Sequence, residues 1–142
     1  MNDDRGQALI LAVLLIAIAS VAVSGLRIAQ EQILASARER RAGESAVEAA
    51  TAVIADAYTA ELRRVAVSSA SPRPTPDVFR AVTDPIAREA ARVAATEVSL
   101  INGGPAIADT AVRCDAGLVD VSITIANRLY RAGFSGPSCS PR

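Results

Sequence analysis

The first part of the chain is almost uniformly apolar. Within residues 8–26, only Ser20, Ser24 and Gly25 depart from alanine, valine, leucine and isoleucine. As an α-helix this run would be about 28 Å long, close to the roughly 30 Å hydrocarbon core of a bilayer. A helix in the core of a water-soluble protein would carry a polar stripe, which this run lacks. The pattern therefore predicts a transmembrane helix, which we assign to residues 7–27.

The same run leaves open whether the segment is kept or removed. Ala17-Ile18-Ala19 fits the small-x-small pattern of a secretory cleavage site. A signal peptide, however, carries clear positive charge before its apolar core, and here Asp3 and Asp4 offset Arg5. The apolar run also continues past residue 19 without a break. We therefore favour a retained helix over an ordinary secretory signal.

Helical spacing continues beyond the membrane segment. Apolar residues recur at steps of three or four, at Val47, Ala50, Ile54, Tyr58, Leu62 and Val65. That spacing marks one face of a helix. The charged stretch 38–45 interrupts the pattern and contains Gly43. The sequence thus predicts an amphipathic helix over 28–67, either as part of one helix of about 60 residues or as a separate helix after a bend near Gly43.

A linker and a second helix follow. Prolines at positions 72, 74 and 76 forbid helix and favour an extended segment, and we assign residues 68–83 to a proline-rich linker. Asp84 is a good N-cap and Pro85 suits the first helical position, so a helix is expected to begin there. Its expected buried stripe consists of Ile86, Ala90 and Val93 or Ala94.

The C-terminal part changes to a strand pattern. A strong turn signal at residues 102–105 is followed by two short segments that flank the turn 115–117. In the second segment apolar residues alternate with polar ones, which predicts a strand with one buried face formed by Val119, Val121, Ile123 and Ile125. We expect a small antiparallel sheet of two or three strands, with residues 131–142 as loop. The predicted fold class is α+β, with 84–142 as a small α+β region.

Composition narrows the classes of function. Formal net charge is zero, which argues against a nucleic-acid partner. Aromatic residues make up 3% of the chain, which argues against an aromatic-lined ligand pocket. There is no histidine, the commonest general base, and no lysine, so a P-loop and Schiff-base chemistry are excluded. We expect neither an enzyme nor a small-molecule substrate, and assign no catalytic residue, metal or cofactor.

The two cysteines carry information on the compartment. A disulfide between Cys114 and Cys139 would pin a glycine- and proline-containing tail, and closing a loop of about 25 residues would contribute roughly 3 kcal/mol. Unpaired thiols remain the alternative, whereas a reactive thiol is disfavoured because the chain has no histidine and no CxxC motif. Disulfides persist in oxidising compartments. A disulfide would therefore place the region after the membrane helix outside the cytoplasm.

The arginines give the opposite indication of orientation. Only Arg5 precedes the apolar run, whereas Arg27, Arg38, Arg40 and Arg41 follow it. A literal positive-inside count would place the C-terminal part in the cytoplasm. We give more weight to the cysteines and expect the N-terminus inside and the C-terminal region outside.

Three carboxylates lie near the predicted hairpin, at Asp109, Asp115 and Asp120. Clustered carboxylates suit hard cations such as Ca²⁺. Their spacing matches no metal-binding loop, and solvated strand and turn positions explain them. We therefore favour solvated positions for these carboxylates, with a Ca²⁺ site as the alternative.

The opening "RGQALI", residues 5–10, resembles the start of TadE/TadG-like minor pseudopilins of the tight-adherence (Flp) pilus system. A short polar leader, a glycine, a membrane helix that extends into an amphipathic helix and a small β-containing domain are also the layout of type IV pilins. The segment "SAVEAATAVIADAY" is similar to the alanine-rich helix of that family. The resemblance covers about residues 5–60 and is architectural beyond them.

The resemblance implies a specific set of partners. A prepilin peptidase would remove the leader 1–6 by cutting after Gly6, leaving Gln7 as the new N-terminus. Many pilins carry glutamate five residues after the cut, where it pairs with a neighbouring subunit, and here that position is Leu11. The leucine favours a minor or initiating subunit over the repeating filament subunit. The implied partners are membrane lipid, the peptidase, other pilin or pseudopilin subunits and the pilus assembly machinery.

Two functions are thus carried forward from the sequence. The first is a single-pass minor pseudopilin of the bacterial cytoplasmic membrane that takes part in assembling a Tad-type pilus or a related secretion apparatus. The second is a secreted or membrane-anchored binding domain of the cell envelope that is unrelated to pili.

Overall fold

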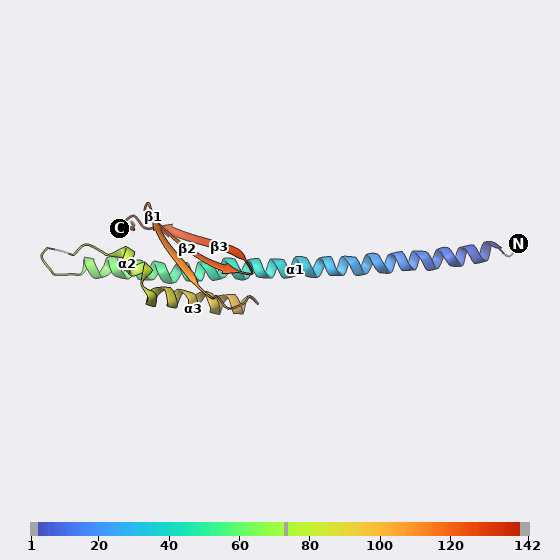
Figure 1. The fold of residues 1–142 in the computed structure, drawn as a ribbon, viewed down its shortest axis with the longest axis horizontal. Coiled ribbons are helices and arrows are strands. Elements are labelled where there is room, and N and C mark those ends of the chain that lie inside the picture. Colours follow the sequence, from blue (N-terminus) through green and yellow to red (C-terminus); the bar gives the residue numbers. More distant parts are fainter. Residues whose placement is uncertain (1–2, 73, 140–142) are drawn as a thin grey trace. The chain divides into compact units, whose positions relative to one another are not determined.

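The computed structural model describes residues 3–72 and 74–139, and it has the predicted α+β class (Figure 1). The chain divides into two compact units, Met1–Ala37 and Arg38–Arg142. The elements follow one another as α1 (Asp3–Ala66), α2 (Val78–Thr83), α3 (Pro85–Ile101), β1 (Thr110–Asp115), β2 (Leu118–Ile125) and β3 (Arg128–Ser135).

Helix α1 is continuous from Asp3 to Ala66, so the interpretation as one long helix holds and the bend near Gly43 does not occur. Its predicted apolar face lies in the core of the second unit. Val47, Ala50, Ile54 and Tyr58 are buried, and Leu62 and Val65 are partly buried. The buried face also begins earlier than the spacing suggested, at Ala42 and Ala46, which have no exposed surface.

Gly43 has a packing role instead of a bending role. A Cβ atom at this position would overlap the ring of Tyr130 on β3. Glycine inside a helix costs about 1 kcal/mol relative to alanine. Here the missing side chain gives the aromatic ring a place directly against the helix backbone.

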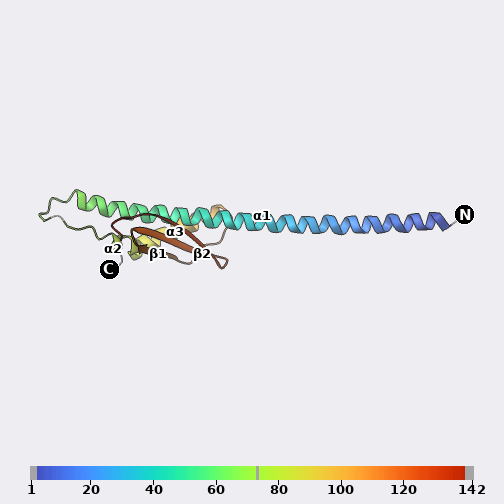
Figure 2. The same cartoon turned by 90° about the horizontal axis from the view of Figure 1, so that it is seen from above.

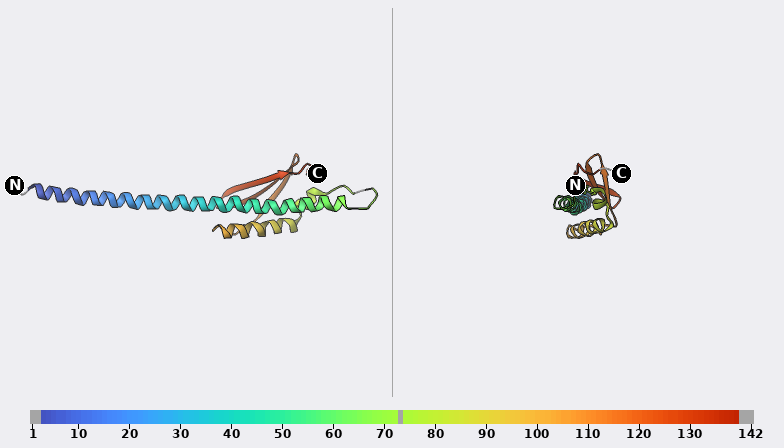
Figure 3. Two further views of the ribbon diagram at one scale, coloured as in Figure 1. Left: turned by 180° about the vertical axis from the view of Figure 1, so that it is seen from behind. Right: turned by 90° about the vertical axis from the view of Figure 1, so that its left-hand side faces the viewer.

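The three strands form an antiparallel sheet in the order β1-β2-β3. The predicted alternation of β2 is confirmed, since Val119, Val121, Ile123 and Ile125 are all buried. Within the second unit, the sheet and α3 pack with the later part of α1 around one hydrophobic core (Figures 1 and 2). The end-on view in Figure 3 shows α1 and α3 on the same side of the sheet.

The expectation that residues 131–142 form a loop is wrong for Arg131–Ser135, which belong to β3. Every second side chain of this strand, at Tyr130, Ala132 and Phe134, packs on the core. The rings of Phe134 and Tyr58 meet edge to face with centroids 5.5 Å apart. Polar and apolar residues alternate only weakly along β3, because two of its outward positions are Leu129 and Gly133. Contact with α1 therefore holds this strand in place.

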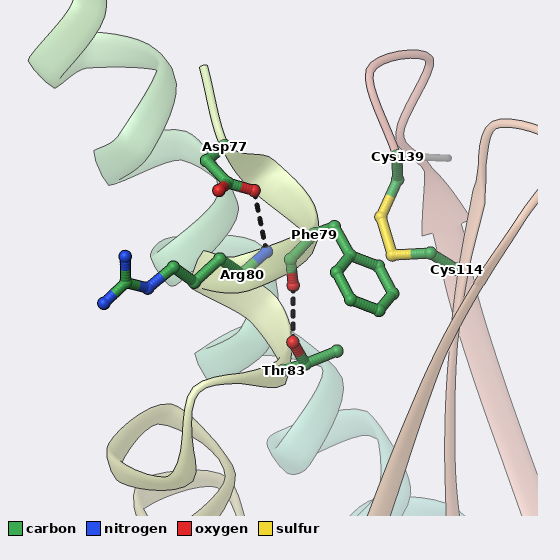
Figure 4. Close-up of a disulfide and its surroundings, with 6 residues drawn as sticks. All are labelled: Asp77, Phe79, Arg80, Thr83, Cys114 and Cys139. Atoms are coloured by element: carbon green, nitrogen blue, oxygen red, sulfur yellow. Dashed lines mark hydrogen bonds between the residues drawn. A yellow bond between two sulfur atoms is a disulfide. The ribbon is translucent and has the colours of Figure 1, made fainter. Parts of the chain in front are cut away.

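The expected linker 68–83 contains a short helix. Val78 and Val82 of α2 are buried. The carboxylate of Asp77 caps this helix by accepting a hydrogen bond from the backbone N–H of Arg80 (Figure 4). Two buried valines therefore draw the last six residues of the expected linker into the core.

The predicted start of α3 is confirmed, but its predicted buried stripe is wrong. Asp84 is the N-cap and accepts a hydrogen bond from the N–H of Ile86, with Pro85 at the start of the helix. The residues buried on α3 are Ala91, Ala95 and Ser99. Ile86 and Val93 are instead 81% and 51% exposed. Small side chains face the core because they allow the helix backbone to approach closely.

The predicted disulfide joins Cys114 of β1 to Cys139, which follows β3. Both cysteines are buried. The bond lies beside the Phe79 ring of α2 (Figure 4). Backbone hydrogen bonds from Gly117 N–H to Cys139 O and from Cys139 N–H to Gly136 O fold the tail back onto the first hairpin. The C-terminal segment is therefore part of the folded unit up to residue 139.

Replacing Gly43 by alanine tests the close contact with Tyr130. We expect Gly43→Ala to destabilise the second unit by about 1–3 kcal/mol, the usual range for overpacking, despite alanine's higher helix propensity. The free energy of unfolding would be measured by chemical denaturation of the detergent-solubilised full chain. Gly25→Ala is the matched control, because no atom beyond its neighbouring residues and the backbone of its own helix turn lies within 4 Å of its added Cβ. Equal stability of the Gly43→Ala variant and the wild type would contradict the contact.

Candidate functional site

The sequence-predicted positions near the N-terminus lie in α1. Gly6 and Gln7 belong to its helical backbone, and the surroundings of these two residues lie outside what the structure describes. Leu11 is 57% exposed within the apolar segment. Among the described residues, α1 is the one helix long and apolar enough to cross a membrane, and its most apolar stretch has no buried side chain. The chain is therefore compatible with single-pass membrane anchoring.

The few polar groups in the apolar segment are satisfied within the helix. The hydroxyl of Ser20 donates to the carbonyl of Ile16, and that of Ser24 donates to the carbonyl of Ser20, each at 2.8 Å. In hydrocarbon an unsatisfied donor would cost several kcal/mol. The two serines are therefore no obstacle to insertion.

The structure does not bring the three aspartates together. Asp109 lies before β1 and receives a 3.2 Å ion pair from Arg88, whereas Asp115 lies at the opposite end of that strand. Asp120 lies opposite Arg113 in the sheet register. Within the part of the chain that the structure describes, no group of three histidine, cysteine, aspartate or glutamate side chains could hold a metal ion.

A groove in the second unit lies between α1, α2 and α3, and we call it the head groove. Its volume is about 630 Å³. The apolar lining comes from Val53, Ala57, Ala81, Ile86, Ala87 and Ala90, and the charged lining from Glu61, Arg64, Asp77, Arg80 and Asp84. Sequence reasoning missed this groove because it assigned one wall to a linker and another wall to the buried stripe of α3.

Glu61 fixes one end of the head groove. Its carboxylate accepts two hydrogen bonds from the Arg64 guanidinium, at 2.6 and 2.7 Å, and one from the backbone N–H of Asp77, at 3.0 Å. The hydrogen bond from Arg64 is the main cause that lowers the pKa of Glu61 to about 2, with the Asp77 N–H adding to it against the opposing effect of burial. The ionised carboxylate thus attaches the start of α2 to α1.

The outward face of α3 is set by polar contacts on its other side. Arg88 Nε donates to the carbonyl of Thr110, and Arg92 Nη1 donates to that of Ile107, each at 3.2 Å. Thr96 Oγ1 accepts a hydrogen bond from the Ile107 N–H. These bonds hold the helix against the segment leading into β1. The aliphatic residues that remain outside are Ile86, Ala90, Val93, Leu100 and Ile101.

The chemistry of the head groove suits contact with another apolar surface. Its lining residues include no pairing of a nucleophile with a base, since the polar members are carboxylates and guanidiniums only. The floor is aliphatic and built largely from alanine, which leaves room for a helix to approach. The head groove thus combines an aliphatic floor with charged edges.

The link between Glu61 and Arg64 predicts a pH dependence. The pKa of Glu61 in the folded protein is about 2, below its ordinary value of 4.5. The ionised carboxylate therefore stabilises the fold at pH values above about 4.5, and this contribution is lost as the pH falls from about 4.5 toward 2. We expect Glu61→Gln to unfold at lower temperature than the wild type near neutral pH, and the difference to shrink with acidification. Thermal unfolding of the full chain in detergent at several pH values would measure it. The control is Glu97→Gln, on the exposed side of α3; a pH-independent difference for Glu61→Gln would contradict the assignment.

Comparison of the chain with models of known protein families, with curated proteins and with solved structures finds no match.

Proposed function

We propose that the protein is a structural subunit anchored in the bacterial cytoplasmic membrane, a TadE/TadG-like minor pseudopilin that takes part in assembly or initiation of a Tad-type pilus or a related secretion apparatus. The observation that carries the proposal is the continuity of α1. A single helix from Asp3 to Ala66 contains both the apolar segment and the core face of a small α+β unit. A helix shared in this way couples an anchor directly to a folded head.

Two features of the sequence support the family assignment. The motif "RGQALI" provides Gly6 and Gln7 for cleavage by a prepilin peptidase, and leader removal would leave an N-terminus directly before the apolar run. Leu11 stands where a filament subunit would often carry glutamate. An apolar residue at this depth favours insertion and lacks the charge that would pair with a neighbouring N-terminus. A minor or initiating position fits that substitution.

The disulfide supports an extracytoplasmic head. Cys114 and Cys139 are paired and buried, and such bonds persist in oxidising compartments. With one membrane segment, an outer head requires the N-terminus inside. The partners in this arrangement are the peptidase, membrane lipid, other pilin or pseudopilin subunits and the assembly machinery.

The alternative function is a membrane-anchored or secreted binding domain of the cell envelope. The head groove and the exposed aliphatic residues of α3 favour some form of binding partner. This alternative needs neither processing at Gly6 nor association with pilus subunits.

The mass of the native protein distinguishes these functions. Intact-mass measurement and N-terminal sequencing of the protein from native membranes should show loss of residues 1–6 and a start at Gln7. A start after residue 19 would indicate secretion and would overturn the pseudopilin proposal. An uncut chain would support a simple membrane anchor instead.

A charge in the middle of the apolar run tests anchoring itself. We expect Leu15→Arg to abolish stable insertion, at a cost of roughly 2.5–3.5 kcal/mol at a helix centre. Membrane fractionation of the full chain would show its loss from the membrane pellet. The control is Ala60→Arg, which adds the same charge at an exposed position of α1 beyond the apolar segment. Unchanged membrane association of Leu15→Arg would argue against a transmembrane segment.

A further inference from the structure

Helix α3 is apolar on two opposite sides. Its buried side consists of small residues, Ala91, Ala95 and Ser99. On the other side five residues recur at alternating steps of four and three, and we call this row the α3 ridge: Ile86, Ala90, Val93, Glu97 and Leu100. Its large aliphatic members, Ile86, Val93 and Leu100, are 81%, 51% and 57% exposed. A helix at the surface of a protein normally turns a polar face outward, so this grouped aliphatic row marks an interaction surface.

The spacing of the α3 ridge suits a helical partner. Alternating steps of three and four residues are the spacing of the positions that face a second helix in a coiled coil. From Ile86 to Leu100 the ridge is about 21 Å long at 1.5 Å per residue, which corresponds to roughly four helical turns. Ile86 and Ala90 belong both to the ridge and to the lining of the head groove. A helix that follows the ridge would therefore enter the groove at one end.

Helix α1 lies alongside the ridge within the second unit. Ala87, near the start of α3, lines the head groove together with Ala57 of α1. Ser99, near the end of α3, and Ala42 of α1 both border Gly104. The two helices therefore run antiparallel and side by side in this unit, as Figures 1 and 3 show. A third helix can pack against both of them, because the groove between them is floored largely by alanine.

The unpaired charges around this surface change sign along its length. Arg63 and Arg80 lie at the end formed by α2 and the last turn of α1, and Figure 4 shows the Arg80 guanidinium extending away from Asp77. Asp56 on α1 and Glu97 on the ridge lie farther from that end. All four are exposed and form no ion pair with any residue that the structure describes. The other charged residues of the groove and α3, besides Asp77, have partners within the second unit: Glu61, Arg64, Asp84, Arg88, Glu89 and Arg92.

The position of Glu97 argues against two occupants of the ridge. Helices that lie on a membrane surface carry lysine or arginine beside their apolar face, whereas this ridge contains a carboxylate and is flanked by Glu89. A second copy of α3 in parallel would set Glu97 against its own equivalent. An antiparallel copy centred on Val93 would set Glu97 against Glu89. Like charges at such positions oppose pairing, so lipid and self-association both fit the ridge poorly.

We propose that the α3 ridge and the head groove bind an amphipathic α-helix of a different protein, with apolar residues at heptad spacing, a lysine or arginine facing Glu97 and an acidic residue near Arg80. A charged residue within a coiled-coil row of apolar residues selects the partner that neutralises it. The inference rests on the proposed function for the class of partner, another subunit of the same assembly, and deepens it by naming the contact. A surface that selects a different chain suits a minor subunit that does not repeat.

Photo-cross-linking of the full chain in its native membranes tests the proposal. A benzophenone amino acid in place of Val93 should give an adduct with a chain of different mass. Mass spectrometry should show that the modified segment has apolar residues at heptad spacing and a lysine or arginine within one turn of the adduct. Leu100 is a second position for the label if the first disturbs folding. The matched control is the same label at Leu118, which is 50% exposed on the outer side of β2 and should give no such adduct.

Reversing the charge at Glu97 separates a specific contact from mere proximity. We expect Glu97→Arg to weaken the adduct from Val93 several-fold and Glu97→Gln to weaken it less. Changing the basic residue of the captured helix to glutamate should restore the adduct of the Glu97→Arg variant. Unchanged cross-linking of Glu97→Arg would overturn the proposal. So would an adduct with lipid, a product of twice the mass of the chain, or the absence of an adduct from both Val93 and Leu100.

The proposed function has a separate readout in the same membranes, namely the N-terminus of the chain. Loss of the leader 1–6 without an adduct would overturn the inference and leave a pseudopilin that associates in another way. A charge-dependent adduct on an unprocessed chain would support the contact at the α3 ridge, and it would count against a pseudopilin in favour of a membrane-anchored binding domain.

Discussion

The structure depends on how the sheet and α3 close over one face of α1. That face begins with small residues, Ala42, Gly43 and Ala46, and ends with the large side chains of Ile54 and Tyr58. The chain has only four aromatic residues, and all of them are part of this core or pack on it. Tyr130 lies over the glycine at one end of the face, and Phe134 meets Tyr58 at the other. The side chains on this face of α1 thus increase in size from Gly43, which contacts the Tyr130 ring, to Tyr58, which contacts the Phe134 ring.

Polar contacts and the close packing of small side chains together determine how α3 is turned. Arg88 and Arg92 donate to backbone carbonyls of the segment leading into β1, and only small side chains face the core. Large aliphatic residues such as Ile86 and Val93 are therefore left outside. The same orientation of the helix creates one wall of the head groove, so the bonds that hold α3 also shape this groove.

The sequence predicted those elements whose signals are local. The period of α1, the start of α3 at Asp84 and Pro85, and the alternation of β2 follow from spacing and caps. β3 was missed because its outward positions include Leu129 and Gly133, and its burial comes from contact with α1. The buried stripe of α3 was predicted wrongly for a related reason. Hydrophobicity alone predicts that Ile86 is buried in preference to Ala91, whereas close packing of the helix against the core favours alanine at the buried positions. The head groove combines residues from these misread segments, so no local pattern could have indicated it.

The two halves of α1 meet different requirements with a single backbone. A helix that is apolar on all sides is suited to the hydrocarbon core of a bilayer, where every backbone polar group must be hydrogen-bonded within the protein. A helix that is apolar on one side satisfies a water-exposed core. The change occurs around residues 38–45, where exposed charges such as the Arg40–Glu44 pair appear at 2.7 Å. Because the backbone hydrogen bonds run through this change without interruption, no unpaired groups arise between the anchor and the head.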